Sequence, residues 1–210
     1  MEKVKGMKVK LFESMGFSAN CYALEIGDEI ALIDVGQMTL DIMTYIAENI
    51  GRIKYVLLTH NHFDHIGGVA KALEMTDAKL AIHEADGKNL TDPTYNMTSR
   101  VGLSNPDFSV DLMLKDGDIL PLGGETIRVI HTPGHTVGGV CYLVGDVIFS
   151  GDTLFAGTVG RTDFAGGDMA VLLESLQKLA SLSGDFTVYP GHEEATTLAY
   201  EIKTNPYFRM

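Results

Sequence analysis

The feature that most constrains this chain is a set of histidines and aspartates placed in short turns after apolar runs. The densest turn is His-Asn-His-Phe-Asp-His at 60–65, which follows the apolar run 55–58. Comparable turns hold His135 in Thr-Pro-Gly-His-Thr, Asp152 in Ser-Gly-Asp-Thr and His192 in Pro-Gly-His-Glu. Neutral imidazole and carboxylate groups are the ligands that zinc and similar ions take. The pattern therefore predicts a metal centre at the ends of several strands.

The spacing within residues 60–65 indicates two metal ions rather than one. A tight turn can direct alternate residues inward, so His60 and His62 can share one ion while Asp64 and His65 reach a second. A lone histidine is usually a surface or core residue, but these occur as a set. His83 and His131 stand outside the ligand spacing. We interpret His83 as structural and His131 as a partner that supports a ligand.

Hydrophobic periodicity predicts strands in hairpins with helices between them. The expected strands are 9–12, 21–26, 30–35, 55–58, 80–82, 127–130, 140–144, 147–149 and 186–189, and the expected helices are 40–50, 69–75 and 169–179. This order of elements, in two similar halves, favours sheet packed on sheet with helices outside. We therefore predict an α/β (α+β) fold with four αββα layers.

Residues 86–108 form a long polar segment with no clear period, and such segments in compact proteins are usually functional or mobile. We expect this segment to overhang the metal centre and name Tyr95, Arg100 and Phe108 as candidate substrate contacts. Arg161 is a fourth candidate from the other side of the site. For Arg161, a structural ion pair, with Asp163 or with a more distant carboxylate, is at least as good an interpretation as substrate binding.

The composition of the chain indicates which kinds of partner and which cellular location to expect. The formal net charge of −12 opposes binding to nucleic acid and to anionic membranes, so a small-molecule substrate is expected. The length of 210 residues predicts one domain over 1–210, with the oligomeric state open. Two cysteines provide neither a CxxC motif nor a disulfide scaffold. The absence of an apolar run after the basic N-terminal residues predicts a cytoplasmic protein.

The motifs as a set resemble those of the metallo-β-lactamase superfamily of metallohydrolases, over nearly the whole chain. The resemblance implies the metallo-β-lactamase fold, with His60, His62 and His135 on one metal ion, Asp64, His65 and His192 on the other, and Asp152 bridging them. It also implies that Asp34, in Leu-Ile-Asp-Val-Gly, supports the ligands from behind. The runs 151–168 and 188–197 further resemble the short glyoxalase II-like branch, the relatives of hydroxyacylglutathione hydrolase.

That resemblance implies two divalent ions, expected to be zinc with iron or manganese as alternatives, and a metal-bridged hydroxide that attacks a thioester carbonyl. Asp64 is the catalytic residue expected to orient the nucleophile and handle its proton. Two departures bear on the substrate. Only residues 193–210 follow the last histidine, where full-length glyoxalase II has a helical extension that helps bind glutathione. Gly-Arg-Thr-Asp-Phe also replaces a lysine-containing segment.

Three other functions are compatible with the same residues. Gly-Arg-Thr-Asp-Phe also occurs in persulfide dioxygenases, which hold one iron; here its ligands would be His60, His135 and Asp152. Hydrolysis of a lactone, another ester or a phosphodiester on the same dinuclear site is a second alternative. A non-catalytic, metal-stabilised binding module is a third, although structural zinc usually takes four ligands, often with cysteine.

Overall fold

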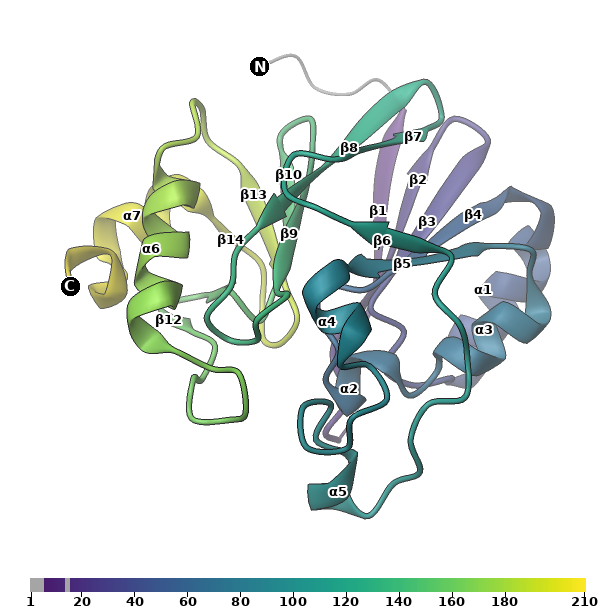
Figure 1. The fold of residues 1–210 in the computed structure, drawn as a ribbon. Coiled ribbons are helices and arrows are strands. Elements are labelled where there is room, and N and C mark those ends of the chain that lie inside the picture. Colours follow the sequence, from purple (N-terminus) through teal and green to yellow (C-terminus); the bar gives the residue numbers. More distant parts are fainter. Residues whose placement is uncertain (1–5, 14–15) are drawn as a thin grey trace.

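Two six-stranded sheets lie face to face in the computed structural model, which describes residues 6–13 and 16–210 (Figure 1). The first sheet has the order β1-β2-β3-β4-β5-β6. Its strands are β1 (Met7–Phe12), β2 (Cys21–Ile26), β3 (Glu29–Ile33), β4 (Ile53–Leu57), β5 (Lys79–His83) and β6 (Leu112–Leu114). The pairs β1–β2 and β2–β3 are antiparallel, and β3 to β6 are parallel.

The second sheet has the order β14-β13-β10-β9-β8-β7. Its strands are β7 (Ile119–Leu122), β8 (Glu125–His131), β9 (Val140–Val144), β10 (Val147–Gly151), β13 (Thr187–Pro190) and β14 (Thr196–Thr197). Only β10 and β13 pair in parallel. A small hairpin of β11 (Leu154–Phe155) and β12 (Thr158–Val159) follows β10.

Helices cover the outer face of each sheet. On the first sheet, α1 (Leu40–Asn49) and α3 (Val69–Met75) bury Ile46 and Ala72 against Leu32. On the second, α6 (Met169–Ala180) and α7 (Leu198–Thr204) bury side chains such as Leu176 against Ile148. Figure 1 shows these helix pairs on opposite sides of the molecule. The predicted four-layer αββα sandwich is confirmed.

The core between the sheets consists of inward-facing side chains from both. Leu24 from β2 and Tyr142 and Phe149 from β9 and β10 belong to this one cluster and are essentially inaccessible to solvent. The central strands β2, β3, β9 and β10 are buried on both faces, which explains their nearly continuous apolar runs. The core fixes the two sheets relative to each other, and the loops at one edge carry the polar turns.

The remaining helices are short: η1 (Ile50–Arg52), α2 (Phe63–Ile66), α4 (Glu84–Lys88), α5 (Thr98–Val101) and η2 (Pro206–Arg209). The prediction of an unstructured segment at 86–108 is therefore corrected in part, since α4 extends into it and α5 lies within it. Among the described residues, no helix is both long and apolar enough to cross a bilayer. Residues 1–5, which contributed to the prediction about the N-terminus, lie outside the described part of the chain.

Candidate metal centre

The polar turns identified in the sequence meet at one edge of the sandwich. His60 and His62 follow β4, and His135, Asp152 and His192 follow β8, β10 and β13. Strands β8 and β10 are each antiparallel to β9, and β13 is parallel to β10. These three strands therefore run in the same direction, and their carboxyl ends bring the later turns beside the turn after β4.

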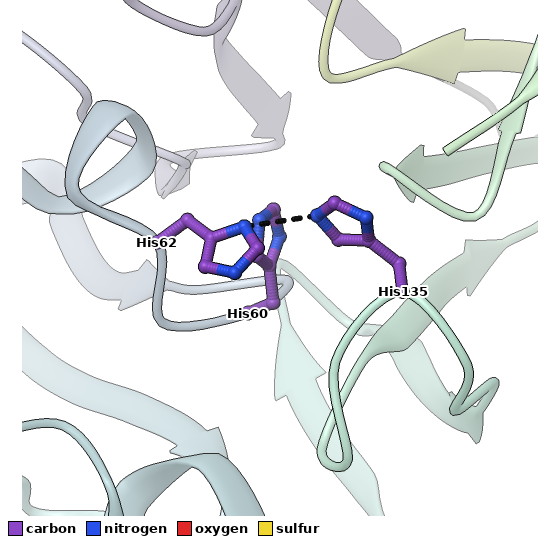
Figure 2. Close-up of side chains that lie close together, drawn as sticks. All are labelled: His60, His62 and His135. Atoms are coloured by element: carbon purple, nitrogen blue, oxygen red, sulfur yellow. Dashed lines mark hydrogen bonds between the residues drawn. The ribbon is translucent and has the colours of Figure 1, made fainter. Parts of the chain in front are cut away.

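His60, His62 and His135 form the first ligand set (Figure 2). Their ring centroids are 4.7 Å apart for His60–His62, 4.8 Å for His60–His135 and 4.6 Å for His62–His135. His62 Nδ1 and His135 Nε2 lie 2.9 Å from each other. The outer nitrogen of His135, Nδ1, donates a hydrogen bond of 2.7 Å to the carbonyl oxygen of Arg161. The lone pair of His135 Nε2 therefore faces the cluster.

Asp64, His65 and His192 form the second set, and Asp152 stands between the two. Asp64 and His65 lie on α2, and Asp64 Oδ2 is 3.9 Å from His65 Nε2 and 3.2 Å from His192 Nε2. Asp152 Oδ1 is 3.3 Å from His65 Nε2, and Asp152 Oδ2 is 3.5 Å from His135 Nε2 and 3.7 Å from His192 Nε2. One carboxylate thus faces ligands from both sets, as a bridging group must.

Asp34 supports one histidine of each set. Its Oδ2 is 3.0 Å from His65 Nδ1 and accepts a 2.7 Å hydrogen bond from Thr59 Oγ1, while Oδ1 accepts from Thr59 N at 2.8 Å. Because the Thr59 hydroxyl proton is used on Asp34, Thr59 Oγ1 accepts from His60 Nδ1, 3.1 Å away. Both histidines are thereby held with their Nε2 lone pairs toward the cluster.

Two glycines are required by close approach. A Cβ on Gly191 would lie 2.3 Å from Asp152 Oδ1 and 2.7 Å from His65 Cε1. A Cβ on Gly134, whose φ is +128°, would lie 2.4 Å from the Cα of Leu172 on α6. Gly134 thus lets the turn that carries His135 rest directly on the helix, and Gly191 leaves room for the ligands themselves.

The charges of the cluster suit a cation. Burial and the neighbouring histidines lower the pKa of His60 well below its ordinary value, and burial with His135 lowers the pKa of His62 to about 3. Burial alone would raise the pKa of Asp152, but His65, His135 and His192 hold it far below the usual range. Burial likewise opposes a charge on His65, but Asp34, Asp152 and Asp64 raise its pKa well above normal. Metal binding at His65 therefore displaces a proton.

The donor set fits divalent ions. His60 Nε2 is buried and has no hydrogen-bond partner among the described residues, although its Nδ1 is engaged by Thr59. A buried nitrogen without a partner is costly unless an ion occupies the position toward which it points. Three histidine nitrogens in the first set, nitrogen and carboxylate oxygen in the second, and the carboxylate of Asp152 between them match the preferences of zinc and iron.

A cavity of about 400 Å³ opens directly onto the cluster. Its lining includes His62, Asp64, His135, Asp152 and His192 together with Phe63, Met97, Phe155, Thr158, Val159, Arg161, Phe164 and Glu193. Its volume is that of an ordinary small-molecule site. Arg161 lies on its rim and makes the ion pair with Asp163 that the sequence suggested, at 2.6 Å for both oxygens.

The other candidate substrate contacts are divided between two places. The guanidinium of Arg100 lies 4.9 Å from the ring centroid of Phe164, at the mouth of the cavity. Tyr95 packs beside Gly166, which belongs to the same loop as Phe164. Phe108 instead lines a separate cavity beneath residues 103–107 and packs on the core of the first sheet. The ring of Phe108 is held by apolar packing and does not line the cavity at the metal centre.

His131 does not support a ligand directly, which corrects the expectation. Its ring stacks on His83 at 4.0 Å with an interplanar angle of 9°, and its Nε2 lies 3.0 Å from the carbonyl oxygen of Val137. It ends β8 and so lies before the turn that bends toward the metal centre. His83 is structural as predicted: its Nδ1 accepts from Ala85 N at the start of α4.

Sequence reasoning missed two residues that shape the site. Thr59 links Asp34 to His60, and Asp86 accepts hydrogen bonds of 2.7 Å each from Thr136 Oγ1 and Gly138 N in the loop that carries His135. The position of Thr59, directly before the histidine motif, was a usable signal. Asp86 carries none, because its partners lie 50 and 52 residues away in the sequence.

The comparisons with known proteins agree with this geometry. The profile of the metallo-β-lactamase superfamily matches residues 15–192. The chain belongs to this superfamily. Its members are mostly hydrolytic metalloenzymes that bind divalent metals, so the chain is a metallo-hydrolase of this class. A protein of Mycobacterium leprae is 37% identical over 96% of this chain and 98% of its own length. Hydroxyacylglutathione hydrolase GloC of Haemophilus influenzae is 33% identical, again over 96% and 98%.

Solved structures share the fold closely. BLEG-1, described as a B3 metallo-β-lactamase, has a TM-score of 0.89 at 32% identity and covers 97% of this chain and 100% of its own. TTHA1623 in a di-iron-bound form has a TM-score of 0.81 at 35% identity over 94% and 99%. ETHE1 from Myxococcus xanthus has a TM-score of 0.73 at 27% identity over 95% and 84%. The metallo-β-lactamase fold predicted from the sequence is confirmed.

Proposed function

We propose that the chain hydrolyses a thioester of the hydroxyacylglutathione type with two divalent ions, zinc in the first instance. The observation that carries the proposal is the completeness of both ligand sets around Asp152, directly beneath a cavity of about 400 Å³. The similarity to GloC over nearly the full length of both chains supports the thioester. Ions held there would acidify a water molecule and polarise a carbonyl oxygen.

The protein side chains have distinct tasks in this proposal. Asp64 lines the cavity, and its Oδ2 lies 3.2 Å from His192 Nε2. Burial opposes ionisation of Asp64, but His65 and His192 lower its pKa, so that the carboxylate is available to orient a nucleophile and accept its proton. Phe155 and Val159 provide a buried apolar wall for a small acyl group.

A second candidate, a mononuclear-iron persulfide dioxygenase, is favoured by the likeness to ETHE1 and by Gly-Arg-Thr-Asp-Phe at 160–164. On this alternative His60, His135 and Asp152 would hold one iron. The complete second set, Asp64, His65 and His192, favours the dinuclear hydrolase.

Turnover assays separate these functions. The zinc-loaded protein is assayed for thiol release from S-lactoylglutathione, and the iron-loaded protein for oxygen uptake with glutathione persulfide. A panel of a lactone, a simple ester and a β-lactam is run beside them. We expect thiol release well above the rate with Asp152→Ala. Oxygen uptake without thiol release would move the assignment to the dioxygenase, and no turnover of any substrate would favour a binding module.

A further inference from the structure

A stack of three side chains stands at the mouth of the cavity. The guanidinium carbon of Arg161 lies 3.9 Å from the ring centroid of Phe164, and that of Arg100 lies 4.9 Å from it. Phe164 itself lines the cavity, and its ring centroid is 6.0 Å from that of the ligand His62. Two cations from distant parts of the sequence are thus positioned on one aromatic ring, next to the metal centre.

Each arginine is held in place by the fold. Arg161 is fixed through its backbone, because its carbonyl oxygen accepts the 2.7 Å hydrogen bond from His135 Nδ1. Arg100 lies in α5, two residues after Thr98 and three after Met97, both of which are buried. The two guanidinium groups therefore remain at the rim while their side chains stay accessible to solvent.

The rim carries two positively charged side chains, whereas the molecule as a whole is strongly negative. The chain has a formal net charge of −12, which repels an anionic substrate. Arg161 is paired with Asp163, whose pKa is held at about 2 by that hydrogen-bonded pair. The Arg100 side chain makes no hydrogen bond or ion pair within residues 6–13 and 16–210, although its charge contributes to the lowered pKa of Asp163. Two guanidinium groups beside one carboxylate leave the stack with a net positive charge at the entrance.

We propose that Arg100 and Arg161, stacked on Phe164, form a subsite for a carboxylate on the thiol half of the substrate. The inner wall of Phe155 and Val159 is buried and apolar, which suits a small acyl group at the metals. The larger thiol half then extends through the mouth toward the exposed arginines. Planar guanidinium groups recognise carboxylates through paired hydrogen bonds. The proposal rests on the thioesterase function and specifies its substrate as anionic.

The test measures binding to the zinc-loaded protein by calorimetry, without turnover. The probes are glutathione, which is the thiol product, and glutathione diethyl ester, in which both carboxylates are masked. We expect the wild type to bind glutathione about tenfold more tightly than the diester, because solvent-exposed charge-assisted contacts are of that order. Arg100→Gln and Arg161→Gln should each reduce this preference and together abolish it.

Two further variants provide controls of opposite kinds. Asp163→Asn releases Arg161 from its partner, so the preference for glutathione should increase. Arg128→Gln removes the same charge from an exposed position on β8 and should leave the preference unchanged. The preference should also decrease as salt is added, since exposed charges are screened.

The outcomes separate the subsite from the proposed function. Equal wild-type affinity for the two probes, no measurable binding of glutathione, or a preference that survives both arginine substitutions would overturn the subsite. If the preference behaves as expected but no thioester is hydrolysed, the subsite stands and the thioesterase function fails. Hydrolysis of neutral and anionic thioesters at equal kcat/KM would leave the function intact and overturn the subsite.

Discussion

Replacing Asp34 by Asn should weaken both metal positions at once. The side chain is only 2% exposed, and Asn has nearly the same shape, so the fold should persist. The carboxylate accepts hydrogen bonds from Thr59 N at 2.8 Å and Thr59 Oγ1 at 2.7 Å, and it pairs with His65, whose Nδ1 lies 3.0 Å away. An amide has one acceptor oxygen and places an NH₂ group against a donor, so at least one of these contacts is lost.

The expected magnitude follows from those contacts. A hydrogen bond to a charged group contributes about 1.5–3 kcal/mol, and loss of a group that orients a metal-bound histidine costs about 10–100-fold in metal affinity. His65 contacts Asp34 directly, so the affinity of its site should decrease by the larger amount. His60 is reached only through Thr59, so the affinity of the first site should decrease by about tenfold or less.

The assay is a zinc titration in competition with a chelating dye, which resolves the two affinities. Asp28→Asn, an exposed carboxylate in the turn between β2 and β3, is the matched control and should bind as the wild type does. Circular dichroism verifies that both variants are folded. Two wild-type affinities in Asp34→Asn would refute the role assigned to this carboxylate.

Four further substitutions test the metal centre, the buried carboxylate Asp86 and the packing of the His135 turn on α6. His62→Ala and Asp152→Ala should each remove most thioester hydrolysis while the circular dichroism spectrum is kept, and wild-type turnover in either would contradict the site. Burial raises the pKa of Asp86 from 3.8 to about 6, so its contribution to the unfolding free energy of the metal-free protein should decrease by about 3 kcal/mol as the pH rises from about 4 to about 6. Histidines with lowered pKa values act in the opposite direction in both proteins, so urea titrations should show this decrease in the difference between the wild type and Asp86→Asn, and a difference that does not change with pH would contradict it. Gly134→Ala brings a Cβ to 2.4 Å from Leu172 Cα, so its unfolding free energy should decrease by at least about 2 kcal/mol, and an unchanged midpoint would refute the steric argument.

The sandwich could be predicted because its central strands are buried on both faces and its longer helices have a clear apolar stripe. Helix α6 illustrates this, since Leu172, Leu176 and Leu179 all face the second sheet. Strands β6 and β7 and helix α7 were missed, because short or partly exposed elements have little periodicity to detect. Helix α5 was hidden for the same reason within a polar segment.

The meeting of the histidines and aspartates at one edge could be predicted because each stands near a strand end with a local signature. What surrounds them depends on contacts between distant residues. The stack of Arg100 and Arg161 on Phe164 joins α5 to the loop after β12, and nothing in either segment specifies the other. His131 was assigned wrongly because its place at the end of β8, near His135, says nothing about the direction of its ring, which lies on His83.

The central claim is that two ions occupy the two ligand sets around Asp152. The most direct measurement is elemental analysis of protein saturated with zinc and freed of excess metal, for the wild type and for His135→Ala and His192→Ala. Each variant removes a histidine from a different set. The account predicts about two ions per chain in the wild type and about one in each variant. One ion per chain in the wild type, unchanged by His192→Ala, would contradict it.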